Sequence, residues 1–376
     1  MIYLDYAATT PVRKEIIDTY TKLLENYYGN SDSLHEIGRK SSKLMEQSRA
    51  MIAQLLHVRT DEILFTSCAS ESNNYAIKGV ALHYQNRGKH IISTCAEHSS
   101  IHNSLEQLKN EFGFDITYLP INKNGVVALS DLKKALRKDT VLVSMMLVNN
   151  ETGAINPIQE CAEYVHKNSR AIFHMDAVQG LGKIDIPIKE VDMATFSAHK
   201  IYGLKGSAIL YKAQNIELLP IISGGQQEFG LRAGTSNAPC NIVLAKTLRL
   251  ALEEQKSAYE HVSKLNTYLR KEIEKIPDMV INSPSNASPF ILNFSDLKIG
   301  SEVMLNALNA KGFAVSAQST CSSKSKAISH VLLAMGLGEI RATHAVRVSL
   351  SHLTTHEEID LFIHTLKEIH DDYQTR

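Results

Sequence analysis

A lysine and an aspartate follow two short apolar segments of the chain. Asp176 stands in HMDAVQGLGK and Lys200 in TFSAHKIYGLKG. Each segment has the pattern of a strand that ends in a polar turn, which predicts that Asp176 and Lys200 lie at adjacent strand ends. An amine there could attack a carbonyl group, and the carboxylate could hold a positive charge beside it. Taken alone, Lys200 is more simply explained as an exposed loop lysine.

A third segment, FTSCASESNNYAIKG, suits a phosphate group. Small and hydroxyl residues, Ser70 foremost, stand where a strand would turn into a helix and leave backbone N–H groups free. By itself, CASES is at least as well explained as an ordinary helix N-cap. Together with Lys200 and Asp176, the segment points to pyridoxal phosphate, which forms a Schiff base with a lysine and needs a carboxylate at its ring nitrogen.

The chain has five cysteines, at 68, 95, 161, 240 and 321, without any CxxC pair. This spacing argues against a disulfide framework and against a zinc site, so no metal is expected. Cys95, Cys161 and Cys240 are predicted to be buried and inert. Cys321 differs because it stands in the polar segment AVSAQSTCSSKSKAISH, where nearby lysines could favour a nucleophilic thiolate.

Seven apolar runs between about residues 40 and 212 alternate with helical patterns, and each ends in a polar cluster. This rhythm predicts an α/β fold with a mostly parallel, seven-stranded sheet. Ligands of such sheets bind beyond the carboxyl ends of the strands, where Asp176 and Lys200 are expected. The runs are EILFTS, HIISTC, FDITYLP, TVLVSMMLVNN, AIFHMDA, MATFSAH and SAILYK.

The length of 376 residues predicts two domains, because single cores stop growing near ~250–300 residues. A pattern of apolar residues at steps of three and four predicts a helix over about 241–275. FILNFS and AVRVSLS then indicate strands of a smaller α+β domain. We expect residues 13–245 to form a large cofactor-binding domain, with 1–12 and 246–376 in the small domain that carries the Cys321 loop.

Composition limits the partners of the molecule. Basic and acidic residues are equal, at 40 each, so no strong net field draws the chain to nucleic acid or to a membrane. The first residues have no signal-peptide pattern, and no apolar stretch is long enough to span a bilayer. A cytoplasmic protein with a small-molecule substrate is expected.

Eight motifs occur in the order in which cysteine desulfurases have them, and the chain resembles this group of the class V aminotransferases over nearly its whole length. The resemblance implies a fold-type I pyridoxal-phosphate enzyme. The motifs are LDYAATTP, TSCASES, EHSSI, VNNETG, MDAVQ, SAHKIYGLKG, RAGT and STCSS.

The resemblance implies roles around the cofactor ring. Lys200 would form the Schiff base and Asp176 would pair with the ring nitrogen. Gln179 would bind the phenolic oxygen. His98 would stack on the ring and assist proton transfer, which suits a group whose unperturbed pKa is about 6.5.

The cofactor phosphate would be bound by Ser197, His199, Ser70 and the backbone at Ala69. Thr235, in RAGT, resembles a residue that reaches the phosphate of the neighbouring subunit's cofactor. The resemblance therefore implies a homodimer in which each active site depends on both chains.

The same resemblance implies the reaction. Arg347 and Asn150 would bind the α-carboxylate of L-cysteine, Asn150 beside the cofactor, and an arginine fork suits a carboxylate. Without the family, Arg347 would be read as a solvated strand residue. Cys321 would take the substrate sulfur as a persulfide, leave L-alanine, and pass sulfur to an acceptor protein of iron–sulfur cluster assembly, tRNA thiolation or a related pathway. The length of the segment after Cys321 is that of the longer-loop branch, which transfers sulfur directly.

The sequence departs from the family pattern at four places, which we expect to affect rate or partner choice more than reaction type. Cys68 replaces a usual glycine, Ser70 a common threonine, Leu204 a usual proline, and QSTC the usual GSAC. A selenocysteine lyase, an aminotransferase or a weakly active scaffold paralogue would keep much of the site. Cys321 argues against an aminotransferase.

Overall fold

Seven strands form the central sheet of the computed structural model, which describes residues 1–317 and 328–374. Their order is β2-β8-β7-β6-β5-β3-β4, in which β8 is antiparallel to both neighbours and the other contacts are parallel. The predicted α/β fold is confirmed. The strands are β2 (Ile63–Thr66), β3 (His90–Thr94), β4 (Asp115–Leu119), β5 (Thr140–Met146), β6 (Ile172–Asp176), β7 (Met193–Ser197) and β8 (Ala208–Lys212).

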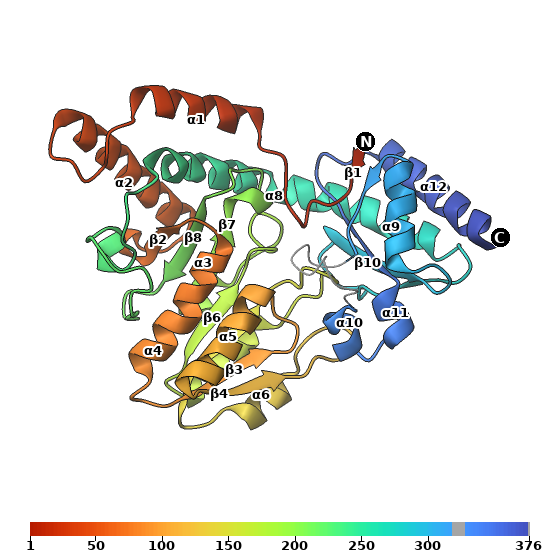
Figure 1. The fold of residues 1–376 in the computed structure, drawn as a ribbon, viewed down its shortest axis with the longest axis horizontal. Coiled ribbons are helices and arrows are strands. Elements are labelled where there is room, and N and C mark those ends of the chain that lie inside the picture. The colour runs from red at the N-terminus through yellow and green to blue at the C-terminus, as the bar shows by residue number, and fades with distance from the viewer. Residues whose placement is uncertain (318–327, 375–376) are drawn as a thin grey trace.

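Six of the seven strands are buried on both faces, which explains why they read as continuous apolar runs, whereas the edge strand β4 is partly exposed. Val143 and Phe173 belong to the core on one face, whereas Leu142 and Ile172 belong to the core on the other. Helices cover both faces (Figure 1). These helices are α2 (Glu36–Leu56), α3 (Ala69–Asn74), α4 (Val80–Tyr84), α5 (Ser99–Phe112), α6 (Leu129–Ala135) and α7 (Ile158–Asn168). Helix α1 (Lys14–Asn26) lies outside them, and its buried side chains pack with Val243.

A separate apolar core lies around a three-stranded antiparallel sheet of order β12-β10-β9. A two-stranded parallel sheet, β1-β11, lies beside it. The strands are β1 (Ile2–Tyr3), β9 (Met279–Ile281), β10 (Ile291–Asp296), β11 (Phe313–Ala314) and β12 (Ala345–Ser349). Helices α9 (Ser301–Ala310) and α12 (His356–Gln374) pack in this core, whereas α10 (His330–Ala334) and α11 (Glu339–Thr343) place buried side chains in the core of the large sheet.

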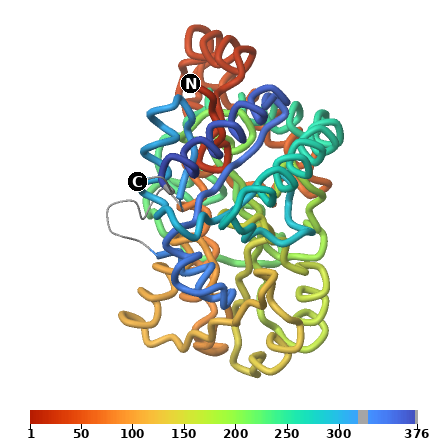
Figure 2. Tube along the Cα trace, turned by 90° about the vertical axis from the view of Figure 1, so that its right-hand side faces the viewer, coloured from red at the N-terminus to blue at the C-terminus, as the bar shows by residue number. Residues whose placement is uncertain are grey.

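Two segments connect the large sheet to the smaller one. Helix α8 (Ala238–Ile273) packs Leu248 in the core of the large sheet and Leu265 in that of the small one, and it runs between them in Figure 1. The second segment is the start of the chain, which lies beside the C-terminal part, where β1 pairs with β11 (Figure 2). The chain then continues into α1. The division at residue 245 stays a prediction.

Within the part of the chain that the structure describes, helices are either too short or too polar to cross a bilayer.

Candidate active site

The carboxyl ends of β5, β6 and β7 meet beside a cavity of about 270 Å³ between the two cores. Parallel strands place their carboxyl ends at one edge of a sheet, so the polar residues that follow them converge there. Nine of the predicted site residues line this cavity: Ala69, Ser70, His98, Asn150, Asp176, Gln179, His199, Lys200 and Arg347.

Lys200 ends a short 3-10 turn that follows β7. Its Nζ donates hydrogen bonds to the carbonyl oxygens of Ala7, at 2.5 Å, and Ala8, at 2.7 Å. Both carbonyls belong to the N-terminal LDYAATTP segment, which therefore forms part of the site although it lies almost 200 residues away in sequence. The alternative of an exposed loop lysine does not hold, because Lys200 is partly buried and lines the cavity.

Asp176 is the last residue of β6 and is 6% exposed. Its carboxylate accepts hydrogen bonds from the backbone N–H of Val178 and from Nδ2 of Asn73, both at 3.0 Å. Asn73 Nδ2 also donates to Ser100 Oγ at 2.9 Å, and Ser100 Oγ contacts His98 Nδ1 at 2.9 Å. A polar chain thus joins Asp176 to His98, and sequence reasoning missed its two middle members, Asn73 and Ser100.

His98 caps the N-terminus of α5, because its Nδ1 accepts the backbone N–H of Ser100 at 3.2 Å. Burial lowers the pKa of His98, and the charge of Lys200 lowers it further, while Asp176 acts in the opposite direction. The neutral imidazole is therefore favoured. Since Nδ1 accepts, the proton of the neutral ring lies on Nε2.

Ser197 and His199, two of the predicted phosphate-binding residues, line a neighbouring cavity of about 400 Å³ that shares Ala8, Cys68 and His199 with the first. Ser197 Oγ is buried there and has no hydrogen-bond partner within the described residues. Burial, together with Lys200, Lys205 and Lys183, lowers the pKa of His199 to about 4. A buried hydroxyl without a partner needs one from a ligand, and the nearby lysines favour an anion, so the residues fit the phosphate of pyridoxal phosphate.

Cys68, which replaces the usual glycine, is exposed and precedes α3. Its backbone has φ −165° and ψ 164°, an extended conformation that any residue adopts. Glycine is therefore not needed here for its conformational freedom.

Arg347 lies in β12 and is 2% exposed, so the alternative of a solvated strand arginine is wrong. Its Nη2 donates to Asp5 Oδ1 and its Nη1 to the carbonyl oxygen of Asn150, both at 2.9 Å. Nε has no partner within the described residues. The guanidinium is thus held in place by Asp5 and Asn150, and Arg347 lines the cavity.

Two predicted residues cannot be placed in either cavity. Thr235 is exposed and is not among the residues that line them. Cys321 lies outside the described residues. On either side of the segment that contains it, Ser316 donates to Asp5 Oδ2 at 3.0 Å, and Ser329 Oγ donates to Glu151 Oε2 at 2.6 Å.

Among the other thiols, Cys161 and Cys240 are buried as expected, whereas Cys95 is only partly buried. Burial raises the pKa of all three, that of Cys161 to about 12. Such thiols are poor nucleophiles.

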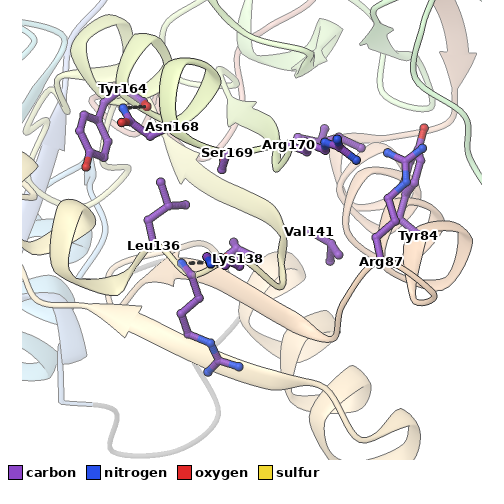
Figure 3. A pocket seen from close by; sticks show the side chains of 12 residues that line it. Tyr84, Arg87, Leu136, Lys138, Val141, Tyr164, Asn168, Ser169 and Arg170 are labelled. Atoms are coloured by element: carbon purple, nitrogen blue, oxygen red, sulfur yellow. Dashed lines mark hydrogen bonds between the residues drawn. The ribbon is translucent and has the colours of Figure 1, made fainter.

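A larger cavity of about 670 Å³ lies at the opposite edge of the sheet, where β5 and β6 begin (Figure 3). Arg87, Arg137, Lys138 and Arg170 contribute to its lining, and Arg137 pairs with Asp139 at 2.6 Å. Ligands in sheets of this type bind at the carboxyl edge, so this cavity is not the candidate active site.

Residues 1–317 and 328–374 contain no group of three or more histidine, cysteine, aspartate or glutamate side chains placed to hold a metal ion.

The fold and the cavity define an α/β enzyme with fold-type I architecture. The model of the family "Aminotransferase class-V" matches residues 2–362. A protein named "Cysteine desulfurase IscS" from Dictyoglomus turgidum is 42% identical over 100% of this chain and 95% of its own length. The chain belongs to the class-V aminotransferase family, and the expected resemblance to its cysteine desulfurases is confirmed.

Solved structures agree with this assignment. A "NifS-like protein" superposes with a TM-score of 0.92 at 36% identity and covers 100% of both chains. The structure titled "SspA in complex with cysteine" superposes with a TM-score of 0.83 at 33% identity and covers 94% of this chain and 100% of the other.

Proposed function

We propose that this enzyme uses pyridoxal phosphate to remove sulfur from L-cysteine, with L-alanine and a persulfide on Cys321 as products. One observation carries the proposal: a single cavity gathers Lys200, Asp176, His98 and the buried Arg347. A lysine, a carboxylate, an imidazole and a carboxylate-binding arginine are the groups that such a reaction on an amino acid needs.

When bound, the cofactor supplies an electron sink for the carbanion of the substrate. Asp176 would pair with the protonated ring nitrogen, and its two hydrogen-bond donors, Asn73 Nδ2 and Val178 N–H, fix the position of its carboxylate. Ser197, His199, Ser70 and the backbone at Ala69 would bind the phosphate. Gln179 would donate to the phenolic oxygen.

Arg347, with Asn150 beside it, would orient the substrate by its α-carboxylate. The contacts with Asp5 and with the carbonyl oxygen of Asn150 hold the guanidinium beside the cavity. His98 would stack on the ring and, as a neutral imidazole, exchange protons through Nε2. In the transfer step, a bond forms between Cys321 Sγ and the substrate sulfur while the carbon–sulfur bond breaks, and a proton completes L-alanine.

The structure titled "SspA in complex with cysteine" supports L-cysteine as the substrate. The contacts of Ser316 and Ser329 support the role of Cys321, because both reach residues that neighbour Arg347 or Asn150 in space or sequence. The enzyme would be a cytoplasmic homodimer that passes sulfur to an acceptor protein. The acceptor's pathway, whether iron–sulfur assembly or tRNA thiolation, stays a prediction.

The test is to measure alanine and sulfide from L-cysteine with added reductant and to record the cofactor spectrum. We expect Cys321→Ala to keep the spectrum and to lose sulfide formation at least about 100-fold, because removal of a nucleophile removes a whole catalytic step. Cys161→Ala is the matched control, since that thiol is buried in α7 and should leave both readouts unchanged.

If Cys321→Ala is as active as the wild type, Cys321 is not the sulfur acceptor, and a lyase that releases sulfur or selenium without a persulfide is the better account. If the purified wild type shows no cofactor band and none appears on addition of pyridoxal phosphate, the scaffold alternative stands and the proposed enzyme fails.

A further inference from the structure

Lys183 is a second buried lysine near the candidate active site, and no catalytic step uses it. It is 9% exposed and follows β6 in the segment AVQGLGK. Its Nζ donates to Oε1 of Gln179 at 2.9 Å, and Nε2 of Gln179 donates to the carbonyl oxygen of Ala7 at 2.9 Å. Gln179 is itself 6% exposed and lines the cavity.

These two contacts determine which end of the Gln179 amide is oxygen and which is nitrogen. A carbonyl oxygen such as that of Ala7 only accepts, so Nε2 must face it. The ammonium of Lys183 only donates, so Oε1 must face Lys183. A reversed amide would place two acceptors together and two donors together. The amide nitrogen keeps a second N–H, and the side chain can offer it to an oxygen of a bound ligand.

The carbonyl oxygen of Ala7 also accepts from Lys200 Nζ at 2.5 Å. Lys183, Gln179, Ala7 and Lys200 therefore form one continuous set of hydrogen bonds. A substitution that removes the contacts of Gln179 would therefore also alter the hydrogen bonds of Lys200, the amine that is predicted to hold the cofactor.

The surroundings of Lys183 disfavour a positive charge, because the side chain is buried and lies near two other cations. Burial, with the charges of Lys200 and Arg347, lowers the pKa of Lys183 to about 7. The neutral amine still has N–H groups to donate, so the hydrogen bond to Gln179 does not depend on the charge. The titratable and charged groups around a small cavity beside Lys183 are Tyr6, Arg13, Lys200, Tyr202, Glu254 and His352.

We propose that Lys183 is a positioning residue: it holds the Gln179 amide with its N–H toward the cavity, where the phenolic oxygen of the cofactor would lie. This inference rests on the proposed function. It assigns to Lys183 a role that acts through Gln179 and does not require contact with the cofactor.

The experiment compares Lys183→Met, Gln179→Ala and the double variant. We expect Lys183→Met to weaken binding of pyridoxal phosphate up to about tenfold, the effect of one lost hydrogen bond. It should also shift the pH midpoint of the cofactor absorbance change by about one unit. In the Gln179→Ala background the same change should have less than about a twofold effect, since a residue that acts through Gln179 has nothing left to position.

Lys212→Met is the matched control. Lys212 is also buried and hydrogen-bonded to backbone carbonyl oxygens, but it lies at the end of β8, and no site residue is among its hydrogen-bond partners. Lys212→Met should leave the cofactor spectrum unchanged even where it lowers the thermal unfolding midpoint. A wild type that does not bind the cofactor would contradict the proposed function itself. Two outcomes with a wild type that binds the cofactor would overturn the role of Lys183 and leave the proposed function standing. In the first, Lys183→Met has the spectrum and the affinity of the wild type. In the second, the effects of Lys183→Met and Gln179→Ala simply add in the double variant.

Discussion

Asn73 lines the cavity and shows how the candidate site depends on a residue that sequence reasoning did not find. Its Nδ2 donates to the carboxylate of Asp176 and to Ser100 Oγ, and the residue is 1% exposed. Asp176 would pair with the protonated ring nitrogen, and Ser100 Oγ contacts the imidazole of His98. One amide thus connects Asp176 and His98, the two side chains that are predicted to face the cofactor ring.

Asn73→Ala removes one of two donors to the Asp176 carboxylate. A hydrogen bond to a charged group contributes about 1.5–3 kcal/mol, so we expect the affinity for pyridoxal phosphate to fall roughly 10- to 100-fold. Titration of cofactor absorbance measures this. Asn168→Ala, which removes an exposed amide at the end of α7, is the control and should change nothing. Equal affinities for Asn73→Ala and the wild type would show that Val178 N–H alone suffices.

Sequence reasoning could find the residues that stand at strand ends but not their partners. Lys200 and Asp176 follow apolar runs, so their meeting was predictable. Asn73 reaches Asp176 across 103 positions and Asp5 reaches Arg347 across 342, and neither spacing has a periodic signal. A weak signal did exist for Ser100, because it stands two residues after His98, which caps the N-terminus of α5.

At the scale of elements, a row of polar side chains crosses the buried sheet. His174 in β6 contacts Ser144 Oγ in β5 at 2.9 Å and Thr195 Oγ1 in β7 at 3.0 Å. The ring is fully buried, and burial lowers the pKa of His174 to about 3. The histidine therefore stays neutral while it joins three strands that lead to the active site.

This neutral histidine predicts a loss of stability in acid. As the pH falls below about 6.5, the unfolded chain binds a proton at His174 that the folded chain does not, so the free energy of unfolding decreases. The contribution is about 1.4 kcal/mol per pH unit between the two pKa values. Urea unfolding of wild type and His174→Gln between roughly pH 7 and pH 5 should give curves whose difference has this slope. His364→Gln, an exposed site in α12, should follow the wild type; parallel wild-type and His174→Gln curves would refute the prediction.

A buried ion pair connects α2 to the loop that carries Thr235. Arg49 and Glu228 are nearly inaccessible and joined by two hydrogen bonds of 2.7 and 2.9 Å. Glu228 has φ 48° and the next residue, Phe229, φ 61°, a left-handed conformation that side chains rarely adopt. The ion pair and the packing of Phe229 on Arg49 hold the loop in this shape.

Arg49→Met would leave the Glu228 carboxylate buried without its partner. Breaking such a pair costs about 3–5 kcal/mol, so the unfolding midpoint should fall clearly. The double variant Arg49→Met with Glu228→Gln should recover part of the loss, because no buried charge remains. Lys40→Met, which breaks the exposed pair with Glu36, serves as the control and should have no measurable effect. A double variant less stable than Arg49→Met would contradict this account.

The elements themselves were largely predictable. Each of the seven apolar runs is a strand, and burial on both faces gives six of them a continuous apolar signal. The predicted helix over about 241–275 is α8 at Ala238–Ile273. The strand order was not predictable from these patterns. The antiparallel β8 lies between β2 and β7, and buried strands carry no local mark of their neighbours.

At the scale of the whole molecule, one chain forms the cavity but leaves Thr235 outside it. The loop around Thr235 also exposes Ile221, Ile222 and Phe229, which are 38%, 40% and 54% accessible. Exposed apolar side chains on one loop favour contact with another protein surface. A second copy of this chain is the partner that the family resemblance implies, with Thr235 at the phosphate of the other subunit.

Mixed dimers test this arrangement. Lys200→Ala removes the cofactor amine and Thr235→Ala weakens the contact to the phosphate, so at a cofactor concentration near the wild-type Kd each variant alone should be impaired. If Thr235 acts across the dimer, a mixed dimer has one site with the intact lysine of one chain and the intact threonine of the other. After denaturation and joint refolding, about a quarter of all sites should be intact, and the rate of sulfide release should exceed the sum of the separate variants. If Thr235 acted within its own chain, every site would keep one defect and mixing would give no gain.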